Sequence, residues 1–133
     1  MITDSENLMT IVKTDDKLSL LTDAIVEGMQ NKKAKHIVSL DLRNLNNRVV
    51  DKFIICHGEN DRQVEAIARE VEDHVFKTLN EKPWHREGFE NKEWILLDYV
   101  NIVVHVFLQD KRDFYAIEEL WGDAEIEEFK DFS

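Results

Sequence analysis

The sequence predicts a single α/β domain with a mixed β-sheet flanked by helices, in the order α-β-β-α-β-β-β-α. Three observations lead to this prediction. The chain has 133 residues, which is enough for one hydrophobic core. Segments with helical spacing of apolar residues alternate with short runs rich in β-branched residues. Four glycines and one proline leave little material for linkers between modules.

The first helix is expected to follow a flexible N-terminal arm. Residues 1–13 are polar and lack a clear apolar period, so we assign them to the arm and begin the domain proper, residues 14–124, after it. Apolar side chains then recur at intervals of three and four residues, as on the buried face of a helix: Leu18, Leu21, Ile25 and Met29.

Two strands and a second helix are expected next. Residues 37–42 and 52–57 are short and rich in branched side chains, which favours strands. The second run ends at Gly58, and a helical period begins after Asn60, whose side chain can cap the helix together with Gln63. A strand, a glycine turn and a helix in succession predict the first half of a βαβ crossover.

The remaining chain is expected to form three strands, one helix and a tail. Residues 84–87 form a short strand, and residues 93–98 and 102–107 form an antiparallel hairpin. The last helix begins near Asp110 and has a predicted buried stripe of Phe114, Ile117, Leu120 and Trp121. Residues 125–133 form an acidic C-terminal tail, which we expect to be exposed.

The charge of the chain limits its partners. Seventeen basic residues against 28 acidic ones give a net charge of −11, which repels nucleic acid and anionic membranes and favours a basic protein partner. No apolar stretch is long enough to cross a bilayer. A single cysteine cannot form an internal disulfide, so we expect a soluble protein of a reducing cytoplasm.

The residues most often used in catalysis do not form a known motif. Cys56 precedes a helix, which could activate its thiol, but it alternates with Ile54 on a strand and is better interpreted as core. The five histidines lack the spacing of a zinc site. His105 lies between apolar residues on its strand face and is interpreted as a hydrogen-bonded histidine of the core or the sheet surface.

Three aspartates at predicted strand ends leave one catalytic alternative open. Asp41, Asp51 and Asp98 could hold Mg²⁺ if the fold brought them together, although aspartate at strand ends is also ordinary turn chemistry. Trp94 opens a strand whose face it shares with Asp98. Tryptophan is a favoured interface anchor and equally often plain core.

Three ordered blocks of the sequence carry a family resemblance. Residues 51–68 contain D-K-F-I-I-C-H-G and R-Q-V-E-A-I-A. Residues 87–107 contain E-G, W-I-L-L-D-Y and V-V-H-V-F, and residues 112–121 read R-D-F-Y-A-I-E-E-L-W. From about residue 18 to 124 the chain resembles the ribosomal silencing factor family, also called Iojap. It departs from the family pattern at Asn60, where serine is usual, and at Lys52, where an aromatic residue is usual.

The resemblance implies a nucleotidyltransferase-like fold and a homodimeric translation regulator that is not an enzyme and needs no cofactor. Such proteins bind ribosomal protein L-fourteen on the large subunit, keep the small subunit away and lower translation when nutrients are scarce. We expect Trp94 to anchor this contact, with Glu87 and Asp98 as polar partners. Tyr99 and His105, from the same blocks, complete the predicted binding surface. The alternative is a Mg²⁺-dependent nucleotidyltransferase-like enzyme using the three aspartates.

Overall fold

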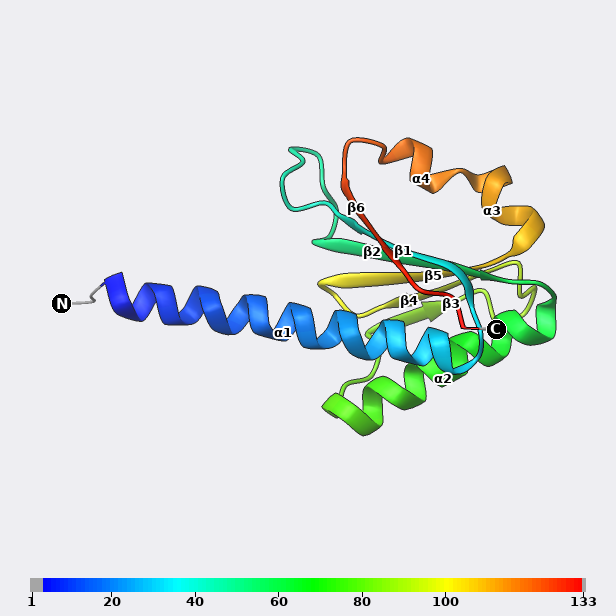
Figure 1. Cartoon of the computed structure of the whole chain (residues 1–133), viewed down its shortest axis with the longest axis horizontal. Helices are drawn as coiled ribbons and strands as arrows, with labels where there is room; N and C mark the ends of the chain where they lie inside the picture. Colours follow the sequence, from blue (N-terminus) through cyan, green and yellow to red (C-terminus); the bar gives the residue numbers. More distant parts are fainter. Residues whose placement is uncertain (1–3, 133) are drawn as a thin grey trace.

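The computed structural model describes residues 4–132, and their side chains from residue 16 onward. Figure 1 shows the arrangement of its ten elements. In chain order these are α1 (Asp4–Asn31), β1 (Lys35–Asp41), β2 (Lys52–Gly58), α2 (Asp61–Leu79), β3 (His85–Glu87), β4 (Trp94–Asp98), β5 (Ile102–Leu108), α3 (Gln109–Tyr115), α4 (Ile117–Leu120) and β6 (Glu125–Phe129).

The strands form one mixed sheet of six strands in the order β3-β4-β5-β2-β1-β6. Only β2 and β5 are parallel among the pairs of the described chain, and the other neighbours are antiparallel. A parallel pair needs a long crossover connection, which here contains α2, β3 and β4. The expected single α/β domain with a mixed sheet, the crossover after β2 and the β4–β5 hairpin are therefore confirmed.

Helices α1 and α2 cover one face of the sheet (Figure 1). Both helices contribute to the larger hydrophobic core with fully buried side chains, such as Ile25 of α1 and Ile67 of α2. The two helices approach closely at Gly28, where a Cβ atom would lie 2.9 Å from the Cα of Val71. Glycine in a helix costs about 1 kcal/mol relative to alanine, so close packing of α1 on α2 explains its presence.

The other face of the sheet carries the smaller core. Its buried members come mainly from the sheet strands and include Leu40, Phe53, Ile55 and Phe107. Helices α3 and α4 lie on this side in Figure 1. They are only seven and four residues long, and Ile117 of α4 and Trp121, which follows α4, pack against this core.

The N-terminal arm differs from the expectation. Helix α1 begins at Asp4, so residues 4–13 continue the helix, and Figure 1 shows that its N-terminal part projects beyond the sheet. No glycine or proline interrupts the chain before Gly28, and such residues are what usually end a helix. Residues 1–3 of the predicted arm lie outside the described residues.

The predicted last helix and tail also differ from the expectation. The helix is divided at Ala116, whose φ of 51° ends α3. Phe114 and Leu120, predicted to be buried, are 74% and 76% exposed, because the break turns them away from the sheet. Part of the tail forms β6, antiparallel to β1. This pairing satisfies backbone groups of β1 that would otherwise be unpaired, and it leaves the acids of β6 exposed, as expected.

Candidate functional site

Four of the five predicted binding residues share one face of the sheet. Glu87 pairs with Leu96, and Leu96 pairs with His105. Residues that pair directly across strands point to the same side, and along β4 every second residue does so too. Glu87, Trp94, Asp98 and His105 therefore all lie on the side of the smaller core, opposite α1 and α2.

Tyr99 lies on the opposite side of the sheet and does not belong to this group. Its side chain packs in the larger core beneath the helices and is 6% exposed. This burial raises the pKa of the Tyr99 hydroxyl above its usual range. A buried ring cannot contact a partner, so Tyr99 is a core residue and leaves the predicted binding surface.

Trp94 is held in place by His105. The indole Nε1 of Trp94 donates a hydrogen bond of 2.9 Å to Nδ1 of His105. His105 is 4% exposed, and this burial lowers its pKa to about 3. The imidazole is therefore neutral at physiological pH and accepts at Nδ1, so its proton resides on Nε2. The imidazole also makes an edge-to-face contact with Phe53, with 4.7 Å between the ring centroids, and this contact helps to fix its position.

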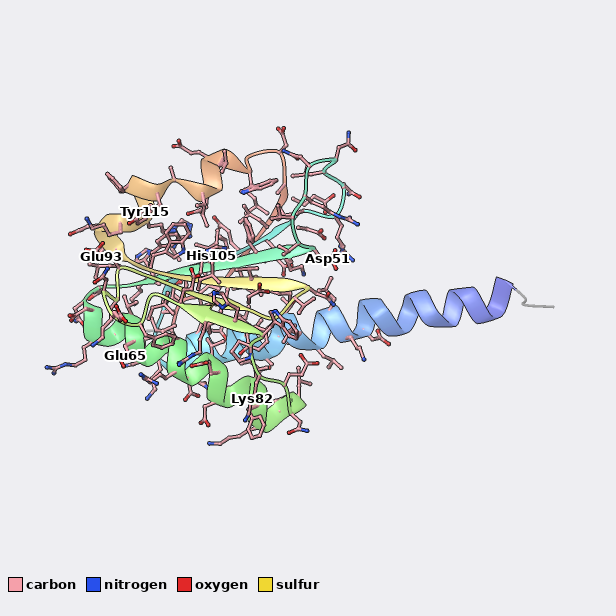
Figure 2. All side chains as sticks on the ribbon, turned by 180° about the vertical axis from the view of Figure 1, so that it is seen from behind. Asp51, Glu65, Lys82, Glu93, His105 and Tyr115 are labelled. Carbon is pink, nitrogen blue, oxygen red and sulfur yellow. The ribbon has the colours of Figure 1, made fainter. Side chains whose placement is uncertain are left out.

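Aromatic contacts fix the Trp94 ring from two further sides. It stacks on Phe107 at a centroid distance of 5.1 Å and meets Tyr115 of α3 at 4.6 Å. Tyr115 is 38% exposed and lies between α3 and the sheet (Figure 2). Five accessible or half-buried side chains thus form one surface, which we call the β4 face: Glu87, Trp94, Leu96, Asp98 and Tyr115. His105, predicted to belong to the binding surface, is buried and supports Trp94 instead.

Acidic groups border the apolar centre of the β4 face. The carboxylate of Glu87 is 64% exposed and lies 2.7 Å from Nε2 of His85. Asp98 uses Oδ1 to accept a hydrogen bond of 2.8 Å from the backbone N–H of Val100. Its other oxygen is bonded to no group in the described part of the chain. A half-buried aromatic anchor with carboxylates beside it suits a partner that combines an apolar pocket with basic side chains.

The three strand-end aspartates lie at one end of the sheet but do not form a metal site. Strands β2 and β5 separate β1 from β4, so Asp41 and Asp98 are about 14 Å apart across three strand spacings. Asp41 is engaged by Arg43 at 2.7 Å, and this bond holds its pKa below the usual range. Asp51 lies at the loop end of β2 (Figure 2). Residues 16–132 contain no group of three potential ligands that could hold a metal ion.

The lone cysteine is confirmed as core. Cys56 is fully buried, and desolvation raises the pKa of its thiol to about 12, so the reactive thiolate is not populated near neutral pH.

Arg112 is a buried residue that sequence reasoning overlooked. Its guanidinium donates to Glu118 Oε1 at 2.7 Å, to the carbonyl of His36 at 2.7 Å and to His57 Nδ1 at 2.9 Å. These bonds fasten α3 and α4 to the ends of β1 and β2, and thereby position Tyr115. The paired Arg112 and Glu118 within one sequence block were the available signal.

The comparisons with known proteins decide the family. Residues 14–133 match the family model described as "Ribosomal silencing factor during starvation". The chain belongs to the ribosomal silencing factor family. It is 44% identical over 95 residues to ribosomal silencing factor RsfS of Bacillus subtilis, covering 71% of this chain and 78% of that protein.

Solved structures agree with this assignment. A crystal structure of a protein from Chromobacterium violaceum is 34% identical and superimposes with a TM-score of 0.71, covering 77% of this chain and 83% of that one. For a protein from Bacillus halodurans the identity is 36% and the TM-score 0.67, over 76% and 92% of the two chains. Ribosomal silencing factors are named for a regulatory role rather than a catalytic one. No helix in the described part of this silencing factor is both long and apolar enough to span a membrane.

Proposed function

We propose that this silencing factor binds the large ribosomal subunit through ribosomal protein L-fourteen and thereby prevents the small subunit from joining, which lowers translation when nutrients are limiting. Family membership supports the silencing role. The observation that carries the choice of surface is the β4 face, where Trp94 is immobilised by the hydrogen bond to His105 and flanked by acids.

Trp94 is suited to anchor a partner because it loses little conformational entropy on binding. Trp94 has few conformations left to lose, because His105, Phe107 and Tyr115 already fix its ring. Loss of such an anchor costs about 2 kcal/mol, or about 30-fold in affinity. Glu87 and Asp98 supply charge-assisted hydrogen bonds to basic side chains, and the net charge of −11 speeds encounter with a basic protein.

The proposed mechanism is steric occlusion. A bound factor occupies the surface that the small subunit needs, so its effect follows mass action. At a free concentration of 100 Kd it opposes joining by about 2.7 kcal/mol. No catalytic step is required, and we propose that the protein is not an enzyme. It acts in the cytoplasm, where ribosomes join.

We also propose that the factor forms a homodimer. Phe114 and Leu120 project from α3 and α4 with 74% and 76% of their surface exposed, and burial of such side chains against a second copy would stabilise association. Light scattering across a concentration series tests this proposal, and a monomer at all concentrations would contradict it.

Charge-reversal variants test the proposed contact. We expect Asp98→Lys to weaken co-sedimentation with purified large subunits, and to weaken binding of isolated L-fourteen by a similar factor. Glu90→Lys is the matched control, because Glu90 is exposed, lies outside the β4 face and undergoes the same charge change. Equal weakening by both variants would show a general effect of charge and contradict the proposed surface.

A further inference from the structure

A hollow lies along the outer surface of α2, on the other side of the sheet from the β4 face. Its volume is about 760 Å³, within the range of small-molecule sites. Figure 2 shows Glu65 and Lys82 on this side of the sheet and Tyr115 on the opposite side. Ala66, Phe76 and Pro83 supply apolar wall, and four basic residues line the same hollow: Lys32, Arg69, Lys82 and Arg86.

The two arginines of the hollow are fixed before any ligand arrives. The guanidinium of Arg86 lies 3.9 Å from the ring centroid of Phe89, and its Nη2 donates to Glu72 at 2.8 Å. The guanidinium of Arg69 lies 5.0 Å from the same centroid, and its Nε donates to Glu65 at 2.8 Å. Each guanidinium has five N–H donors, and these bonds use one nitrogen of each group. Pre-ordered donors lower the entropic cost of binding an anion.

The lining of the hollow carries a net positive charge, opposite in sign to the net charge of the chain. Its lining has four basic residues against three acidic ones, in a chain whose net charge is −11. Each of the three acids is already engaged: Glu70 accepts from Asn31 at 2.9 Å, Glu72 from Arg86 at 2.8 Å, and Asp73 from Lys77 at 2.9 Å. Lys82 lies with its Nζ 5.2 Å from the ring centroid of Phe76, so positive charge and aromatic surface adjoin.

We propose that this hollow binds a small organic anion. A phosphate or carboxylate head group fits the fixed guanidinium groups of Arg69 and Arg86, since the planar fork of arginine matches both oxyanions. A flat apolar body fits against Phe76 and Pro83, where ring stacking adds to burial. The site is separate from the β4 face, so the factor can hold this ligand and a ribosomal partner together.

An NMR titration of the full chain with three probes tests the proposal. The probes are phenyl phosphate, benzoate and inorganic phosphate, and the readout is the amide signals of Arg69, Phe76 and Lys82. We expect saturable shifts with a Kd of about 1 mM or tighter for at least one aromatic anion. The tighter of the two identifies the head group. Inorganic phosphate should bind more weakly, because it lacks the apolar body.

Two variants and a matched control distinguish a specific anion site from nonspecific electrostatic attraction. Arg69→Gln and Lys82→Gln should each raise the Kd of the better aromatic probe, Arg69→Gln by about tenfold. Arg62→Gln removes an exposed cation of the same helix that does not line the hollow, and should leave the Kd unchanged. The proposal is overturned if no probe gives saturable shifts, if inorganic phosphate binds as tightly as the aromatic anions, or if Arg62→Gln weakens binding equally.

Discussion

The buried imidazole of His105 makes the stability of the fold depend on pH. In the unfolded chain a histidine gains its proton as the pH falls through about 6.5. In the folded protein burial keeps His105 neutral down to a pKa of about 3. Between these values the unfolded state binds more protons, so the free energy of unfolding falls as the pH is lowered. At pH 5, which is about 1.5 units below the pKa of a histidine in the unfolded chain, the loss in the free energy of unfolding is about 2 kcal/mol.

His105→Asn isolates this contribution. The Oδ1 of asparagine occupies a place close to that of imidazole Nδ1, so it still accepts from the Trp94 indole, but it does not titrate. Urea denaturation at pH 7 and pH 5 measures the free energy of unfolding of both proteins. The wild type should lose about 2 kcal/mol more than His105→Asn between the two pH values, because all other titrating groups are shared.

One clear outcome decides this test. If His105→Asn loses as much stability as the wild type on going from pH 7 to pH 5, His105 is not held neutral by burial. The assignment of neutral His105 as the acceptor of the Trp94 hydrogen bond would then be wrong.

Two further predictions concern β6 and the contact between α1 and α2. Replacing Glu125, Glu127 and Glu128 by glutamine keeps β6 but removes exposed charge, so association with large subunits should slow while dissociation stays unchanged, as surface plasmon resonance at two salt concentrations would show. An effect on dissociation alone, equal at both salts, would make β6 a contact surface. Gly28→Ala should lower the free energy of unfolding, measured by urea titration, by about 1–3 kcal/mol, because the added Cβ would lie 2.9 Å from the Cα of Val71. Unchanged stability would show that α1 and α2 are not in tight contact.

Elements with a local pattern could be predicted from the sequence. The β4–β5 hairpin and α2 follow from alternation and from the period after Asn60, whose side chain accepts from Gln63 N–H at 2.9 Å as expected for a cap. Strand β6 could not be predicted in this way, since it pairs with β1 across more than eighty residues and its own sequence is mostly acidic. Non-local pairing leaves little trace in local composition.

The candidate site, too, could be predicted from the sequence only in part. That Trp94 and Asp98 share one side of the sheet follows from their spacing of four residues along one strand. The bond between Trp94 and His105 depends on the register of β4 against β5, which the sequence does not state. Tyr99 follows Asp98 directly, so the same alternation places its ring on the opposite side of the sheet, in the larger core.

A subunit-joining assay tests the role of the β4 face most directly. Purified small and large subunits are mixed with the factor, and the fraction of joined ribosomes is measured by sedimentation at increasing factor concentrations. Wild-type factor should reduce joining, and Trp94→Ala should need about 30-fold more protein for the same effect. Trp84→Ala, which removes a tryptophan that is 81% exposed outside the β4 face, should behave as wild type. Equal potency of Trp94→Ala and wild type, with both proteins folded, would contradict silencing through the β4 face.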